Sequence, residues 1–312
     1  MCALLVDRRC QTDTSTTNCS RCLTKMMTKK ISLALVALLI AILLIPSLAD
    51  QSTVTIDWQV KDIDAFISEH KSKPWVTQID MYGTKLKPEQ LEKIKSELPG
   101  VSIGCQVWLT EKHYVRTDAT AYTLNHNNRA KKHKSSDFNA LKYCQNLMAL
   151  DLSHNQIDDL GFLKNLPKLR VLLLGDNQIE DISALADLHD LEYLELFKNK
   201  IKDVTPLMDL DNLIDLNLSH NYIDDLFPLA KLSNLMRLWI YNSNNYSAKD
   251  PIPKETVAEL EEALYGTYID STSYSTLGGW REHPRYYVVF NMFHGRIEWL
   301  PWDADGLVPR YK

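Results

Sequence analysis

Histidines and carboxylates are the side chains of this sequence that could support acid–base or metal chemistry, but they form no arrangement typical of an active site. The chain has no Gly-x-Ser-x-Gly, His-Glu-x-x-His, phosphate-loop or dinucleotide-binding motif. His154 and His220 recur at one repeat position at least about 10 Å apart, too far to share a metal ion. An enzyme built on the tail would need Glu282, His283 and His294 to converge, which their spacing does not force. We therefore predict no catalytic residue, no metal site, no cofactor and no enzymatic activity.

Cysteines could also bind a metal or form disulfides. Four of the six precede Met26 and include one Cys-x-x-Cys motif, whose spacing suits metal or redox chemistry. Translation that began at Met26 or Met27 would leave all four out of the protein. Only Cys105 and Cys144 follow, and the sequence leaves open whether they pair, since two thiols make no disulfide framework.

The element that must position any functional side chain is a repeat. It recurs every 22 residues, as marked by Leu147, Leu169, Leu191, Leu213 and Leu235. Its common form is L-x-x-L-x-L-x-x-N-x-I-x-D-[LIV]-x-x-L-x-x-L. The alternating leucines are typical of a short strand that turns them inward and its other residues outward. A period of this length predicts a solenoid of stacked turns.

An asparagine occupies the ninth position of each regular repeat, where the strand ends. Its side chain both donates and accepts hydrogen bonds, so it can satisfy backbone groups that the turning chain leaves unpaired. Stacking of the repeats then predicts a structural asparagine ladder of Asn155, Asn177, Asn199 and Asn221.

These repeats identify the chain as a leucine-rich-repeat protein. The unit resembles the 22-residue type of the internalins of Gram-positive bacteria, and the layout is similar to that of secreted or surface leucine-rich-repeat proteins of Firmicutes. The resemblance covers residues 147–245, about a third of the chain. It implies an α/β solenoid with short parallel strands on the concave face and irregular or short helical segments on the convex side. It says almost nothing about the ligand, which non-consensus residues decide.

The concave face is the predicted binding surface. Positions three, five and seven of each repeat face outward, and the later repeats collect large aromatic and charged side chains there. This composition matches protein-binding hot spots, and contiguous apolar surface usually has a function. We predict that a protein or peptide partner contacts Leu173, Tyr193, Glu195, Phe197, Asp215, Asn217, Arg237, Trp239 and Tyr241. The alternative is that the C-terminal tail or the segment 110–146 folds over these strands.

The flanks divide the chain further. Residues 76–109 resemble a repeat strand and turn followed by a helix, and the helical pattern recurs at residues 254–269, which suits irregular repeats that cover the ends of a solenoid. The basic residues near position 130 indicate a solvated loop or docking to an anionic surface. The aromatic tail predicts a C-terminal cap, with a strand at residues 285–290. The predicted regions are an N-terminal extension with signal peptide (1–49), a cap with an irregular repeat (50–109), an insertion loop (110–146), the regular array (147–246), and an irregular repeat with an aromatic-rich cap (247–312).

An apolar run at residues 31–45 follows three lysines and precedes Ser47-Leu48-Ala49, which predicts a signal peptide cleaved after Ala49. An uncleaved anchor that leaves residues 50–312 outside is the alternative, and only that anchor would contact a membrane. Without residues 1–49 the chain carries 29 basic and 38 acidic residues, which argues against nucleic acid. We expect an exported, monomeric, non-enzymatic binding module, or alternatively a structural or adhesive spacer of the cell envelope.

Overall fold

The computed structural model describes residues 52–125, 132–241, 252–272 and 279–293. The chain divides into two compact units, Met1–Val54 and Thr55–Lys312. Only residues 52–54 of the first unit are described, and β1 (Thr53–Thr55) crosses the boundary. Among the described residues no helix is long and apolar enough to cross a membrane. The predicted signal segment, 31–45, and residues 126–131 of the basic stretch lie outside the described residues.

The second unit begins with a small mixed sheet and two helices. Its elements are α3 (Ile63–Lys71), β2 (Gln78–Leu86), α4 (Pro88–Glu97), β3 (Ser102–Trp108) and β4 (Tyr114–Arg116). β2 and β3 are parallel, and β3 and β4 are antiparallel. The helix predicted within residues 76–109 is present: α4 connects the two parallel strands and buries Leu91 and Ile94, which lie three residues apart on one helical face.

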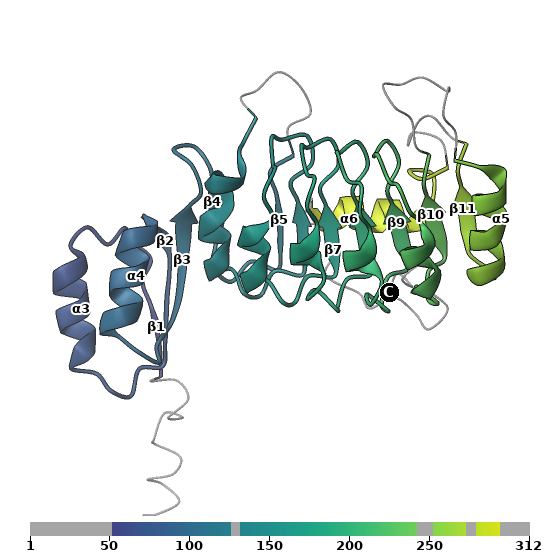
Figure 1. Ribbon diagram of the computed structural model, residues 1–312. Helices are drawn as coiled ribbons and strands as arrows, with labels where there is room; N and C mark the ends of the chain where they lie inside the picture. Colours follow the sequence, from purple (N-terminus) through teal and green to yellow (C-terminus); the bar gives the residue numbers. More distant parts are fainter. Residues whose placement is uncertain (1–51, 126–131, 242–251, 273–278, 294–312) are drawn as a thin grey trace, which may run out of the picture. The chain divides into compact units, whose positions relative to one another are not determined.

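The repeats form a parallel sheet of seven short strands, so the predicted α/β solenoid is confirmed (Figure 1). The strands are β5 (Ala121–Thr123), β6 (Ala149–Asp151), β7 (Val171–Leu173), β8 (Tyr193–Glu195), β9 (Asp215–Asn217), β10 (Arg237–Trp239) and β11 (Tyr268–Asp270). From β6 to β10 each residue pairs with the residue 22 positions later. The period of the sequence is therefore the register of the sheet.

Short 3-10 helices form the back of the repeats. They are η1 (Ser135–Tyr143), η2 (Gly161–Asn165), η3 (Ser183–Leu185), η4 (Thr205–Leu207) and η5 (Phe227–Lys231). The consensus leucines lie between these segments and the strands and are almost fully buried, for example Leu150, Leu172 and Leu194. This continuous apolar layer stabilises the stack, because one repeat alone cannot bury its inner side.

The ninth-position asparagines form a ladder of hydrogen bonds along the stack. Asn177 donates from Nδ2 to the carbonyl oxygens of Leu152 (3.1 Å) and Leu174 (2.9 Å), and its Oδ1 accepts from the backbone N–H of Ile157 (3.0 Å). The same pattern of bonds to the preceding repeat recurs at Asn155, Asn199 and Asn221. Each side chain therefore satisfies three backbone groups that no strand reaches.

The predicted insertion loop needs correction. The described part of residues 110–146 contains β4, β5 and η1, and β5 extends the solenoid sheet by pairing with β6. Phe138 and Leu141 of η1 are fully buried. Ala121 pairs with Ala149, an offset of 28 instead of 22 residues. The longer offset removes this turn from the 22-residue pattern, which explains why sequence analysis mistook it for an insertion.

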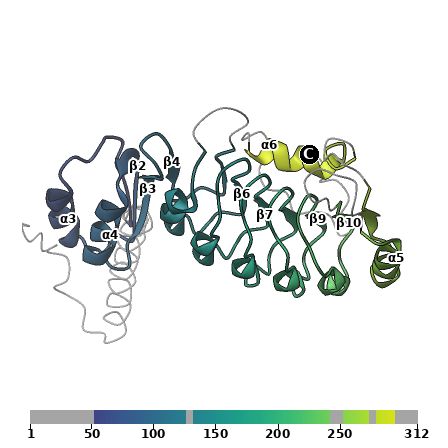
Figure 2. The same cartoon turned by 45° about the horizontal axis from the view of Figure 1, so that its top comes forward.

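The C-terminal end holds a further repeat and a helix that crosses the sheet. α5 (Lys254–Ala263) precedes β11, which pairs with β10, as the irregular repeat predicts. The predicted strand at residues 285–290 is wrong, because α6 (Pro284–Phe293) is a helix. It lies on the strand side of the repeats, opposite the 3-10 helices (Figure 2). Arg285, Val288, Val289 and Met292 are its buried residues, and their spacing of three and four is helical. Packing on the sheet has overridden the strand propensity of this β-branched and aromatic run.

Candidate functional site

The concave face, formed by positions three, five and seven of each repeat, is largely covered. All nine side chains predicted to contact a partner point out of the solenoid core, yet none is more than 9% exposed. Trp280 and α6 of the C-terminal tail pack on most of them, which is the alternative that the sequence left open. Partner binding by these residues remains a prediction, and a partner that touched most of them would first have to displace Trp280 and α6.

Trp280 is the centre of this cover and is fully buried. Its ring contacts Trp239 edge-on and Tyr193 at a tilt, with centroid distances of 5.2 and 5.4 Å. Its Nε1 donates a hydrogen bond to Glu195 Oε1 (2.8 Å), which also accepts from the hydroxyl of Tyr193 (2.7 Å). Two of the outward aromatics, Tyr193 and Trp239, therefore pack within the chain itself.

A buried ion cluster holds the tail at the same end of the face. Asp215 accepts paired hydrogen bonds from Arg237 of β10 (2.8 and 2.9 Å) and from Arg285 of α6 (2.7 and 2.8 Å). Burial alone would raise the pKa of Asp215, but hydrogen bonds and charge from the two arginines outweigh it and lower the pKa. Arg237 also donates to the carbonyl oxygen of Trp280 (3.4 Å). The negative charge of Asp215 is thus compensated within the chain.

Further along the face, α6 packs through apolar side chains. Val288, Val289 and Met292 join one buried cluster with concave residues of β6 to β8. Those partners are Ala149, Val171, Leu173 and Tyr193. The residues at position three of the first repeats are therefore closed off by helix packing, without ion pairs.

A cavity of about 310 Å³ remains between α6 and the first strands of the solenoid. Its strand side consists of Thr123, Asn125, Asp151, Ser153, His154, Leu173, Glu195 and Phe197, and its tail side of Arg281, Tyr286, Val289, Phe290 and Phe293. Such a size is at the lower end for ligand pockets, which are typically about 300–1,000 Å³. This cavity, called here the concave pocket, is the candidate functional site.

Two buried carboxylates give the concave pocket its polarity. Asp151 accepts hydrogen bonds from the backbone N–H of Ser153 (3.0 Å), from Asn125 Nδ2 (3.0 Å) and from the hydroxyl of Thr123 (3.3 Å). Glu195 accepts from Tyr193 and Trp280. Burial raises the pKa of Glu195, and these two hydrogen bonds oppose the rise only in part. Both groups are held as hydrogen-bond acceptors by the fold.

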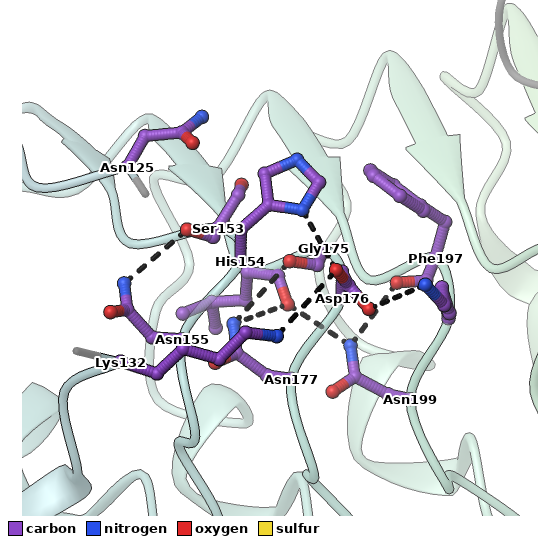
Figure 3. A network of polar contacts seen from close by, with 12 residues as sticks. Asn125, Lys132, Ser153, His154, Asn155, Gly175, Asp176, Asn177, Phe197 and Asn199 are labelled. Carbon is purple, nitrogen blue, oxygen red and sulfur yellow. Dashed lines mark hydrogen bonds and ion pairs between the residues drawn. The ribbon is translucent and has the colours of Figure 1, made fainter. Parts of the chain in front are cut away.

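The rim of the pocket is a chain of charges at the eighth repeat position (Figure 3). His154 Nδ1 contacts Asp176 Oδ2 (2.9 Å), and Lys198 Nζ binds the other oxygen of Asp176 (2.8 Å). Lys132 lies 3.9 Å from the same carboxylate. The backbone at His154, Asp176 and Lys198 has φ between 55° and 62°, the left-handed turn that leads into the ladder asparagine. His154 is therefore held in a structural contact with Asp176.

Other candidate chemistry finds no support among the described residues. No group of three or more histidine, cysteine or acidic side chains there is placed to hold a metal ion. Cys105 and Cys144 are buried free thiols, and burial raises the pKa of each to about 12. Thiols with such pKa values are poor nucleophiles. Of the tail groups, Glu282 and His283 are described but line no part of the concave pocket, and His294 lies outside the described residues.

Of the residues that line the concave pocket, the binding surface predicted from the sequence includes only Leu173, Glu195 and Phe197. Sequence analysis missed Thr123 and Asn125 because the 28-residue offset hides their repeat. It missed Tyr286, Val289 and the neighbouring tail residues because it read the tail as a strand. The helical spacing of Arg285, Val288, Val289 and Met292 was the available signal.

A family model described as leucine-rich repeats (2 copies) matches residues 145–187 and 167–207. Together with the strand registers it confirms the predicted leucine-rich repeats. No curated protein matches the sequence.

Solved structures with similar folds include two internalins of Listeria monocytogenes. For inlF the identity is 21%, the TM-score 0.41, and the coverage 72% of this chain and 58% of inlF. For internalin C2 the identity is 26%, the TM-score 0.31, and the coverage 50% of this chain and 76% of that protein. A leucine-rich-repeat protein of Leptospira interrogans is 22% identical with a TM-score of 0.40, covering 65% of this chain and 56% of its own. The chain thus spans less than two thirds of inlF and of the Leptospira protein.

Proposed function

We propose that this leucine-rich-repeat protein is an exported, non-enzymatic binding module that takes a segment of a protein or peptide partner into the concave pocket. The concave pocket carries the proposal: it is a cavity of about 310 Å³ with buried acceptors on one side and aromatic side chains on the other. Pockets that combine an apolar wall with a few fixed polar groups are typical ligand sites.

A partner segment fits this geometry better than a broad protein surface. Over β8 to β10 the concave face is filled by Trp280 and by the Asp215 ion cluster. A large flat partner would have to expose these buried charges, whereas a side chain or chain end enters the concave pocket without moving them. The binding site is therefore narrower than the nine-residue surface that the sequence predicts.

Export rests on the N-terminal sequence. The apolar run 31–45, its lysine flank and the small residues Ser47 and Ala49 support a signal peptide cleaved after Ala49, with an uncleaved anchor as the alternative. Intact-mass analysis of the protein from the medium and membranes of expressing cells distinguishes them. A chain that begins at Asp50 in the medium supports cleavage, and full-length protein in the cytoplasm alone contradicts export.

The test of binding uses two aromatic residues of one helix. Phe290 lines the concave pocket and Tyr287 does not, although both are exposed, by 42% and 54%. Peptides would be selected from a displayed random library on the full chain, and the affinity of the enriched peptides measured for Phe290→Ala and Tyr287→Ala. We expect Phe290→Ala to weaken binding about tenfold or more, as loss of an aromatic contact at a hot spot does, and Tyr287→Ala to leave it unchanged.

Two results would contradict this function. One is that no peptide is enriched over an empty support. The other is that the enriched peptides bind Phe290→Ala and Tyr287→Ala with the affinity of the wild type. Circular dichroism of both variants confirms that the helix and the solenoid are retained.

A rigid spacer of the cell envelope is the second candidate function. Cover of the concave residues by Trp280 and α6 favours it, because a spacer has no use for an open concave ligand surface. It requires that substitutions in the concave pocket change neither partner binding nor cell attachment. The Phe290→Ala and Tyr287→Ala pair therefore separates the two functions.

A further inference from the structure

We propose that the concave pocket recognises a cationic side chain, the guanidinium of arginine or the ammonium of lysine, presented by the partner. This inference rests on the proposed function and names the chemistry of the ligand. Asp151, Glu195 and Asn125 supply the acceptors, and Phe197 and the aromatic side chains of α6 supply the wall.

Unmatched negative charge is the first argument. Asp151 and Glu195 are only 6% and 4% exposed, and no described lysine, arginine or histidine lies within ion-pair distance of either. Asp215 on the same face, in contrast, is bound by two arginines. A buried carboxylate is costly unless a cation or hydrogen bonds compensate it. A ligand cation would compensate the charge of Asp151 and Glu195, as Arg237 and Arg285 compensate the charge of Asp215.

Spare acceptor capacity is the second argument. Asn125 donates from Nδ2 to Asp151, and this bond turns its Oδ1 the other way. That oxygen is buried and has no hydrogen-bond partner among the residues that the structure describes. An unpaired buried acceptor is unfavourable, and a donor group that reached this oxygen would remove that penalty. Guanidinium and ammonium groups offer five and three N–H donors and no acceptor, which fits a site rich in acceptors.

The aromatic wall is the third argument. Phe197 lies across Gly175, where a Cβ atom would come within 2.1 Å of its ring. Because Gly175 has no side chain, the Phe197 ring can pack directly on the backbone there, at the edge of the pocket. Tyr286, Phe290 and Phe293 line the opposite side. Cations bind favourably over aromatic faces, arginine more often than lysine, and the alkyl part of either side chain packs on the same rings.

Arg281 is the cation of the chain that lines the same pocket. Its guanidinium carbon lies 5.7 Å from the ring centre of Tyr286, and it forms no ion pair with Asp151 or Glu195. His154 is engaged by Asp176. One arginine faces two carboxylates, so the pocket keeps an excess of negative charge for the ligand. Arg281 also places a positive charge on the tail side, which disfavours anionic ligands.

The test compares ligands that differ only in charge. The full chain would be titrated with acetyl-Gly-Arg-Gly-amide and with the citrulline peptide of the same shape, and binding followed by NMR chemical shifts. A lysine peptide and its norleucine counterpart form the second pair. We expect weak binding of the cationic peptides, on the order of 1 mM for ligands this small, and at least about tenfold weaker binding of the neutral peptides, because hydrogen bonds to charged groups are the strong ones.

Variants locate the effect in the pocket. Asp151→Asn and Glu195→Gln keep acceptor oxygens but remove charge, and each should weaken the arginine peptide about tenfold. Glu180→Gln removes an exposed carboxylate that lines another surface, and should change nothing. Retained chemical shifts of the repeat core confirm that each variant is folded.

Equal affinity for the arginine and citrulline peptides would overturn the inference. The absence of any NMR chemical-shift change at a peptide concentration about tenfold above the expected dissociation constant would also overturn it. Unchanged affinity in both Asp151→Asn and Glu195→Gln would do the same. These failures are distinguishable from failure of the proposed function. If library peptides still depend on Phe290 but carry no arginine or lysine, the pocket binds a neutral segment; if no peptide depends on Phe290, the binding function itself is wrong.

Discussion

The two ends of the concave face place buried carboxylates in opposite situations. At β9 and β10, Asp215 is fully buried and clamped between Arg237 and Arg285. At β6 and β8, Asp151 and Glu195 are also buried but face a cavity, and neither forms an ion pair with a described residue. The first end is complete without a ligand, and the second offers room and unmatched charge.

This contrast teaches that burial of an outward residue does not by itself mark or exclude a binding site. Asp215 and Asp151 both occupy outward strand positions, Asp151 in the first regular repeat and Asp215 in the fourth. They differ in their contacts with the C-terminal tail. Arg285 of the tail binds Asp215, and Trp280 packs beside it, whereas α6 leaves a cavity next to Asp151. A carboxylate whose cation lies within the chain is structural, and one whose cation is missing is available to a ligand.

The largest test of the contrast removes the shared carboxylate of the closed end. Asp215→Ala leaves Arg237 and Arg285 buried without their partner. Breaking a buried ion pair in this way typically costs about 3–5 kcal/mol, so we expect a loss of that size in the free energy of unfolding, measured in urea. The variant should also expose the tail to proteolysis near Trp280.

The matched substitution at the other end is Asp151→Asn. It keeps an oxygen acceptor and strands no buried cation, so we expect a loss of at most about 1 kcal/mol. If Asp215→Ala and Asp151→Asn destabilised the protein equally, Asp215 would contribute no more to stability than Asp151, and the contrast between the two ends of the concave face would be wrong.

A medium effect is expected where the tail contacts Glu195. Trp280→Phe removes the Nε1 donor and part of the ring that packs on Trp239 and Tyr193. Loss of a hydrogen bond to a buried charged group predicts a decrease of about 1–3 kcal/mol in the free energy of unfolding. Trp75→Phe, at a tryptophan that is 56% exposed, is the control and should cost close to nothing. Equal effects of the two would mean that the Trp280 contacts contribute no stability.

The smallest effect is the pH dependence of the closed end. Burial and then the charges of Arg237 and Arg285 lower the pKa of His283 from 6.5 to about 4, against the opposing charge of Asp215. Between these pH values the unfolded chain binds a proton that the folded chain does not. Stability from this residue is therefore complete above pH 6.5 and falls as the pH is lowered towards 4.

The check is the free energy of unfolding of the wild type and of His283→Asn across that range. Glu195 acts in the opposite direction, because its raised pKa favours proton uptake by the folded state. The difference between the two proteins cancels this contribution. A flat difference from pH 6.5 to 4 would show that burial and the two arginines do not lower the pKa of His283.

Much of the fold could be predicted because the information is local and repeated. The 22-residue spacing determines the strand register from β6 to β10, and the ninth-position asparagines form the ladder bonds. Prediction failed where the spacing changed, at the 28-residue offset between Ala121 and Ala149, and where propensity and packing disagreed, in α6.

The site was predicted less well, because it depends on distant contacts. Sequence analysis identified which side chains leave the solenoid core, and those positions are correct. It did not identify what lies over them, since Trp280 and Glu195 are 85 residues apart and Arg285 and Asp215 are 70 apart. Such pairings have no period that a single sequence displays.

The sequence by itself determined the solenoid, its register, its asparagine ladder and the outward direction of the concave residues, because each follows from the alternation and period of nearby residues. Only the tertiary structure decided which outward residues are closed and which surround a pocket. That outcome depends on where the tail packs, and packing of a helix on a sheet is set by the shape and charge of both surfaces together. Asp215 and Asp151 are the same residue type on the same face, and their neighbours alone make one a structural anchor and the other a candidate ligand contact.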